Sequence, residues 1–171
     1  MISNFLHHIL RPFNIILARL VNHALPLADQ LRINASLDLV QRKGTMITIR
    51  SGSTLKNASE LSIGNRVLIN HHVQINAAGG VNIGNDVVIG AGCIISTVNH
   101  CGPCFFGNTS RHPITIGNNV WIGAGAILTP GTVIGNNVII AAGAVTTGHI
   151  SGNALWGGVP AKRIKSLSVN Q

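Results

Sequence analysis

Aliphatic residues recur at every sixth position along most of the chain. The positions are Ile63, Ile69, Ile75, Ile83, Ile89, Ile95, Ile116, Ile122, Leu128, Ile134 and Ile140. A small or apolar residue usually stands two places earlier: Val67, Val73, Val87, Cys93, Val120, Ala126, Thr132, Val138 and Ala144. A six-residue period is neither the period of an α-helix nor a hairpin alternation. It predicts short strands joined by turns, with the aliphatic residues pointing inward.

Gly-Asn pairs separate many of these strands, as at Gly64-Asn65, Gly84-Asn85 and Gly135-Asn136. Glycine and asparagine tolerate a positive φ better than other residues, so we expect these pairs to adopt it at the corners. Three six-residue units make one coil of a triangular prism. Stacked coils bury a ladder of Ile and Val, about 4.8 Å apart. The pattern therefore predicts an all-β fold, a parallel β-helix.

Three breaks in the period test this arrangement. The steps from Leu55 to Ile63 and from Ile75 to Ile83 are two residues too long, and Ile95 is followed by Ile116. The breaks begin one coil apart, so they should fall on the same corner of successive coils. The longest break makes residues 96–113 a loop that leaves the prism.

Residues 2–25 follow a helical pattern instead, with apolar residues at three- and four-residue spacing such as Phe5, Ile9 and Phe13. They predict an amphipathic helix, which Pro12 would kink or delay. One interpretation is a helix that caps the open end of the β-helix, because an unpaired sheet edge needs cover. The other is peripheral contact with an anionic membrane face.

Charge and composition narrow the possible partners. The chain has 12 Lys and Arg against 4 Asp and Glu, a formal net charge of +8, which favours an anionic partner. The basic residues are scattered and aromatic residues make up only 4%, so we expect no nucleic-acid binding. The sequence contains no run of 18 uninterrupted apolar residues, so it does not predict a membrane-spanning helix.

Cys93, Cys101 and Cys104 are an odd number of cysteines, and the first 25 residues lack the charged start and cleavage site of a secretory peptide. We therefore expect reduced thiols and a cytoplasmic location. Cys101 and Cys104 have CxxC spacing, but a lone pair of this kind is poor evidence for zinc binding or redox activity.

Among the eight histidines, His100 has the most suggestive position. It follows a regular strand at the base of the 96–113 loop, so it would be held rigidly and remain reachable. An imidazole in such a place suits general-base catalysis. We interpret most of the other histidines as surface residues.

The motifs around this loop resemble the maltose and galactoside O-acetyltransferase branch of the hexapeptide-repeat acyltransferases. The likeness spans roughly residues 60–167 and rests on three segments in order: Thr97-Val98-Asn99-His100, Pro113-Ile114-Thr115-Ile116-Gly117-Asn118-Asn119-Val120-Trp121-Ile122-Gly123, and Gly157-Gly158-Val159-Pro160-Ala161-Lys162. It implies a left-handed β-helix and a homotrimer with active sites between subunits. Acetyl-CoA would be the donor, without a metal.

The resemblance also implies roles for individual residues. His100 would be the general base, and Asn70 would bind the acceptor. Cofactor-binding positions would be Trp121, Ala124, Ala142, Thr147, Lys162 and Lys165. The basic tail would meet the nucleotide phosphates. Residues 101–115 contain no carboxylate, so a backbone carbonyl or a group from a neighbouring subunit would orient the imidazole.

These roles divide the chain into an N-terminal helical and capping segment, 1–45, a β-helix with its active-site loop, 46–150, and a cofactor-binding tail, 151–171. The expected acceptor is a sugar hydroxyl of a surface polysaccharide or its precursor, acetylated in the cytoplasm or at the inner membrane face. An antibiotic or amino-sugar acceptor is an alternative. A zinc enzyme of the carbonic-anhydrase type, with His71, His72 and His100 as ligands, is another, although that family's two-His spacing is absent.

Overall fold

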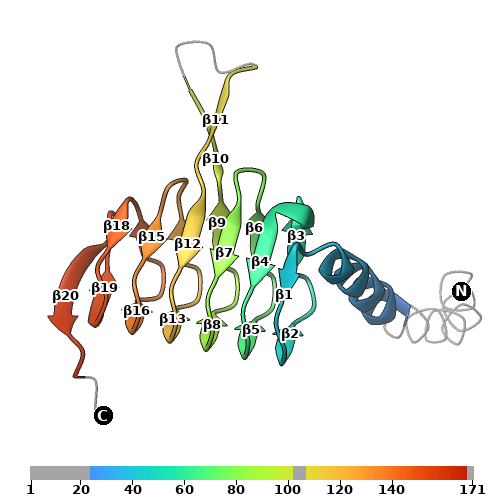
Figure 1. Cartoon of the computed structure of the whole chain (residues 1–171), viewed down its shortest axis with the longest axis horizontal. Coiled ribbons are helices and arrows are strands. Elements are labelled where there is room, and N and C mark those ends of the chain that lie inside the picture. Colours follow the sequence, from blue (N-terminus) through green and yellow to red (C-terminus); the bar gives the residue numbers. More distant parts are fainter. Residues whose placement is uncertain (1–23, 102–106, 169–171) are drawn as a thin grey trace, which may run out of the picture.

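A computed structural model describes residues 24–101 and 107–168. Within them, short strands stack side by side into a long prism with three flat sheets (Figure 1). The first sheet contains β1 (Arg42–Lys43), β4 (Leu61–Ile63), β7 (Val81–Ile83), β12 (Ile114–Ile116), β15 (Val133–Ile134) and β18 (His149–Ile150). Neighbouring strands in it pair in parallel.

The second sheet contains β2 (Ile47–Ile49), β5 (Val67–Ile69), β8 (Val87–Ile89), β13 (Val120–Ile122), β16 (Val138–Ile140), β19 (Ala154–Gly157) and β20 (Lys162–Ser166). The third sheet contains β3 (Thr54–Lys56), β6 (Gln74–Asn76), β9 (Ile94–Ser96), β14 (Ile127–Leu128) and β17 (Val145–Thr146). Successive strands belong to successive sheets, so the chain winds around the prism. Only β20 runs antiparallel to its neighbour within these two sheets of the described chain.

The strand register confirms the six-residue ladder. Ile69, Ile89, Ile122 and Ile140 are direct neighbours across the second sheet, and all four are fully buried. The small or apolar residues two places before the ladder positions are buried as well. The predicted parallel β-helix is therefore confirmed, and its core is one continuous stack of aliphatic side chains.

The three breaks share a corner, as predicted. Leu55, Ile75 and Ile95 pair across β3, β6 and β9, and each insertion follows its strand at the corner between the third and first sheets. The first insertion contains the short 3-10 helix η1 (Ala58–Glu60). The last one forms the hairpin of β10 (Val98–His100) and β11 (Thr109–Arg111).

The expectation for the Gly-Asn corners is wrong in one respect. Positive φ occurs at the residue after the pair, for example at Arg66 and Asn137. The glycine is needed for space, because a Cβ at Gly64 would lie 2.5 Å from the carbonyl oxygen of the next coil. The asparagine is needed for its side chain: the amide oxygen of Asn85 accepts the N–H of Asn65 at 2.8 Å. Each coil thus binds its neighbour through a corner ladder.

A helix over residues 24–38 lies at the end of the prism beside the first coil and runs outward from it (Figure 1). Ile33 is buried in the core, and Asp29 accepts the backbone N–H of Gly52 at 2.6 Å. One coil later, the equivalent N–H of His72 binds a carbonyl of the preceding coil. The Asp29 carboxylate therefore replaces the carbonyl that the first coil lacks. The amphipathic helix expected over 2–25 lies outside the described residues except for its last two.

Candidate active site

His100 lies at the end of β10 on the hairpin that projects from the prism (Figure 1). It pairs with Thr109 in the antiparallel ladder, and its side chain is exposed. Thr97, at the root, is fully buried. Its hydroxyl donates to the carbonyl of Asn76 and accepts the N–H of Gly79, both at 2.8 Å. The root is thus anchored to the preceding coil, and the histidine is presented to solvent.

Among the described residues, none forms a hydrogen bond with the His100 imidazole. The N–H of His100 donates to the side-chain oxygen of Asn99, a contact of the backbone and not of the ring. Neither β10 nor β11 carries a carboxylate. A backbone carbonyl or a group from another subunit remains the prediction for this role.

Small residues form a smooth corner between the second and third sheets. Ala91, Ala124 and Ala142 stack there, because the N–H of Gly125 binds the carbonyl of Ala91 and that of Gly143 binds the carbonyl of Ala124. Ala124 and Ala142 are exposed. The corner therefore offers a flat edge on which an extended ligand can lie close to the backbone.

Asn70 lies on this same corner, after β5 and two coils before Ala124, a separation of about 10 Å. Its side chain is partly exposed. Its carbonyl accepts the hydroxyl of buried Ser53 at 2.8 Å. The predicted acceptor residue and two predicted cofactor residues thus lie along one edge of the prism.

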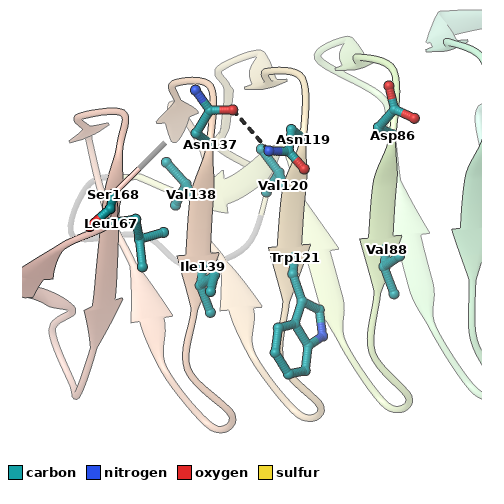
Figure 2. A pocket seen from close by; sticks show the side chains of 10 residues that line it. All are labelled: Asp86, Val88, Asn119, Val120, Trp121, Asn137, Val138, Ile139, Leu167 and Ser168. Carbon is teal, nitrogen blue, oxygen red and sulfur yellow. Dashed lines mark hydrogen bonds between the residues drawn. The ribbon is translucent and has the colours of Figure 1, made fainter. Parts of the chain in front are cut away.

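Trp121 projects from the middle of β13 on the outer face of the second sheet and is 55% exposed. Figure 2 shows it beside Val88 and Ile139, its direct neighbours in the strand register. The surrounding shallow groove has a volume of about 490 Å³ and reaches Leu167 near the end of the described chain. Apolar side chains at matching outward positions continue across the sheet: Leu68, Val88, Trp121, Ile139 and Leu155.

Lys162 and Lys165 lie on β20, which folds back antiparallel to β19 at the C-terminal end of the prism. Both are exposed, as is Arg163 between them. These three cations form no ion pair with any carboxylate of the described residues. They make this end of the second sheet positively charged.

One chain does not bring all the predicted site residues together. His100 and Thr147 lie at the corner between the third and first sheets, since Thr147 follows β17. Asn70, Ala124 and Ala142 lie at another corner, and Trp121 lies on the face of the second sheet. The predicted site residues of one chain are therefore distributed over two corners and one face of the prism.

The sequence interpretation missed a groove on the third sheet beside the hairpin root. Its volume is about 180 Å³, and its polar lining residues are Thr54, Lys56, Gln74, Asn76 and Ser96. These residues occupy outward positions between ladder residues. The period-six pattern could have identified them, because the neighbours of an inward residue in a strand point outward.

Four ionisable groups of the described residues have shifted pKa values with structural causes: Asp29, Arg66, Asp86 and Cys93. The N–H of Gly52 lowers the pKa of Asp29, and Arg32 adds to this effect. Arg66 lowers the pKa of Asp86 through a hydrogen-bonded ion pair. Burial raises the pKa of the Cys93 thiol, which donates to the carbonyl of Gly123. The shifts of Asp29, Asp86 and Cys93 thus arise from contacts between neighbouring parts of the fold.

Two further features concern ligands and membranes. Among the described residues, no group of three or more His, Cys, Asp and Glu side chains is placed to hold a metal ion. In the same part of the chain, no helix has both the length and the apolarity needed to cross a bilayer.

Comparison with known proteins places these features in a family context. Residues 113–148 match the family model described as bacterial transferase hexapeptide (six repeats). No curated protein sequence matches the chain significantly. Several solved protein structures match the chain.

A maltose O-acetyltransferase from Clostridium difficile is 29% identical over 80% of this chain and 75% of its own, with a TM-score of 0.76. A galactoside acetyltransferase in complex with coenzyme A is also 29% identical, over 80% of this chain and 70% of its own, with a TM-score of 0.76. A hexapeptide-repeat acetyltransferase from Vibrio cholerae, complexed with acetyl-coenzyme A, is 25% identical over 81% and 78%, with a TM-score of 0.76.

Proposed function

We propose that this chain, a hexapeptide-repeat acyltransferase with acetyl-CoA as its donor, transfers the acetyl group to a sugar hydroxyl with His100 as general base. The observation that carries the proposal is the likeness, over four-fifths of the chain, to a maltose O-acetyltransferase and to a galactoside acetyltransferase bound to coenzyme A. The exposed His100 on its anchored hairpin supports the assignment of the base.

In the proposed reaction, the His100 imidazole removes the proton from the acceptor hydroxyl as the hydroxyl oxygen attacks the thioester carbonyl carbon. A new C–O bond forms, and the carbonyl oxygen becomes an oxyanion that backbone N–H groups can stabilise. The C–S bond then breaks. The departing thiolate takes the proton from the imidazolium, so the products are the acetyl ester and the coenzyme A thiol.

We propose that acetyl-CoA lies along the corner of small residues. Ala124 and Ala142 leave room for the pantetheine chain beside the backbone, and Trp121 lies on the adjoining second sheet. Thr147 lies at a different corner of the prism, so it would come from a neighbouring subunit. Lys162 and Lys165 pair with the phosphates, because an ammonium group is a suitable partner for a multiply charged nucleotide. Asn70 binds the acceptor at the other end of the same corner.

A homotrimer is part of the proposal, because His100 and Asn70 lie at different corners of one prism. A neighbouring subunit would bring its hairpin to the corner that carries Asn70. The exposed apolar row through Trp121 supports this assembly, since so large an apolar side chain gains by being covered. The group that orients His100 would then come from a backbone carbonyl or from the neighbour.

We further propose that the acceptor belongs to a surface polysaccharide or its precursor. The cytoplasm is the proposed site of the reaction because the odd number of cysteines favours a reducing compartment. Contact with the inner membrane face through residues 2–25 would bring the enzyme to lipid-linked glycans. An amino sugar or an antibiotic hydroxyl is the competing acceptor.

The test is a thiol-release assay with acetyl-CoA and a panel of neutral, acidic and amino sugars. Release that depends on a sugar, with an acetyl ester in the product, is expected. His100→Ala should lower the rate roughly 100- to 10,000-fold, the usual contribution of a general base. His149→Ala is the matched control, because His149 is exposed on the first sheet, away from the hairpin. Unchanged turnover in His100→Ala would exclude this mechanism.

A further inference from the structure

The proposed mechanism assigns no role to the residues that line the groove on the third sheet. Its outward positions along one edge are Lys56, Asn76 and Ser96, which are direct neighbours across β3, β6 and β9. Ser96 immediately precedes Thr97, the buried anchor of the hairpin. The groove therefore ends at the root of the element that carries His100.

The lining chemistry suits a carbohydrate. Lys56, Gln74 and Asn76 provide donors, and hydroxyl groups lie beside them at Thr54 and Ser96. Amides and hydroxyls both donate and accept hydrogen bonds, as sugar hydroxyls require. Ile94, at the same outer face, is 39% exposed and adds an apolar contact.

Lys56 is the single charged side chain among the described residues that line the groove. Lys56 is exposed and forms no ion pair with any of the described carboxylates. Arg111 lies nearby at the hairpin root, where its Cβ is 3.1 Å from the position that a Cβ on Gly79 would take. Glu60, at the far end of η1, is the acidic residue of the adjoining turn and makes no salt bridge with Lys56.

The other described carboxylates lie elsewhere and have partners. Asp29 and Asp38 belong to the N-terminal helix and bind Arg32 and Lys43. Asp86 lies on another corner and binds a neighbouring arginine. The groove therefore presents an ammonium group that has no ion-pair partner among the described residues.

The donor phosphates do not account for this ammonium group. Lys56 is in the first coil, whereas Lys162 and Lys165 pair with a strand of the sixth. Five coil steps of about 4.8 Å separate them by about 24 Å along the prism axis. The two cationic sites thus serve different parts of the reaction.

We infer that the groove binds an anionic group on the acceptor, a carboxylate or a phosphate ester, and that the enzyme selects charged glycans over neutral ones. The inference rests on the proposed function and names its substrate class. Lys56 pairs with the anion, and Arg111 adds positive potential at the hairpin root. The Asn76 amide nitrogen donates to a neighbouring sugar hydroxyl, because the amide oxygen already accepts from Asn57 and Ala78. The Ser96 hydroxyl is already bound to the backbone of Val98 and offers the sugar its remaining lone pair.

The test compares three acceptors: a neutral trisaccharide, a trisaccharide of uronic acids, and the neutral trisaccharide with a phosphate monoester at its reducing end. The wild-type enzyme should have a kcat/KM at least about tenfold higher for one or both anionic acceptors, in line with one charge-assisted hydrogen bond. The anionic acceptor with the higher kcat/KM shows whether the groove binds a carboxylate or a phosphate.

Lys56→Gln should abolish this preference while leaving KM for acetyl-CoA and turnover of the neutral trisaccharide unchanged. Arg42→Gln is the matched control, because Arg42 is an exposed cation of the same coil on the first sheet. Equal turnover of the neutral and anionic acceptors by the wild type would overturn the inference and leave the proposed function intact. A preference that survives in Lys56→Gln would also overturn it.

Direct binding separates the two proposals. Titration calorimetry of the same trisaccharides should show tighter binding of an anionic one, lost in Lys56→Gln. Such binding without transfer to any acceptor would contradict the proposed function and support the groove. Absence of binding by both anionic trisaccharides would refute the groove.

Discussion

Gly123 and Gly125 lie in one turn, on either side of Ala124 at the proposed cofactor corner, and alanine should affect them for different reasons. A Cβ at Gly123 would be 2.5 Å from the backbone nitrogen of Ala142 in the next coil. A Cβ at Gly125 would meet nothing within 4 Å, but this glycine has a φ of +69°. The first substitution is opposed by sterics and the second by conformation.

The magnitudes follow from these contacts. Ordinary contact begins near 3.4 Å, so Gly123→Ala must move the next coil by about 0.9 Å. Overpacking of this kind costs about 1–3 kcal/mol. The shift also stretches the hydrogen bond from the N–H of Gly123 to Ile140, now 2.8 Å, which adds about 1 kcal/mol. Gly123→Ala should cost about 3 kcal/mol, and Gly125→Ala about 1 kcal/mol for a left-handed alanine.

Urea denaturation followed by circular dichroism measures the difference between the two variants. Gly125→Asn is the control, because asparagine tolerates the left-handed region and should recover part of the loss. KM for acetyl-CoA should rise in Gly123→Ala, since the shift separates Ala124 from Ala142. If Gly123→Ala were as stable as Gly125→Ala, the close approach of the coils would not limit this corner.

Three further predictions concern other contacts. Asp29→Asn should weaken docking of the helix. The pKa of Asp29 is lowered in the folded state, so its stabilisation is present above the unfolded value of about 3.9 and is lost as the pH falls through the folded value. Thermal melts between pH 6 and pH 3 should show this loss of stability as a fall in Tm in the wild type but not in Asp29→Asn. The same pH dependence of Tm in both proteins would contradict the prediction. Ser53→Ala removes a buried hydroxyl that joins two backbone groups and should cost about 1–3 kcal/mol, whereas exposed Ser51→Ala should cost less than about 0.5 kcal/mol in the same urea titration. Lys162→Gln combined with Lys165→Gln should raise KM for acetyl-CoA about tenfold at low salt and less at high salt, because exposed charges are screened. An effect independent of salt would assign the lysines a role other than charge.

The corner turns show which features of the fold the local sequence pattern predicted and which it did not. The period of the aliphatic residues was sufficient to predict the β-helix, because each strand must bury the same face in every coil. The pattern did not predict which corner residue has a positive φ. Gly64 and Asn65 suggested that role by their residue types, but the structure gives it to Arg66 and uses Gly64 for the close approach of the next coil. That approach exists only between coils, and a single turn contains no information about it.

In the candidate site, too, some residues could be identified from the sequence and others only from the structure. The sequence identified His100 because a long interruption of a strict period is visible in one dimension. It did not identify Lys56, since an isolated lysine in a strand resembles any solvated residue. Lys56 gained significance only when the register placed it beside Asn76 and Ser96, which are 20 and 40 positions away.

By itself, the sequence determined the core of this protein, its coil-by-coil winding and the corner from which the hairpin leaves. These features follow from a local rule, the burial of the same two positions in every six-residue unit. Tertiary structure alone decided which residues are neighbours across coils: the row of Ala124 and Ala142, the apolar row around Trp121, and the groove at Lys56. The physical reason is that insertions change the number of residues per coil, so lateral contacts depend on the register of stacked strands and not on distance along the chain.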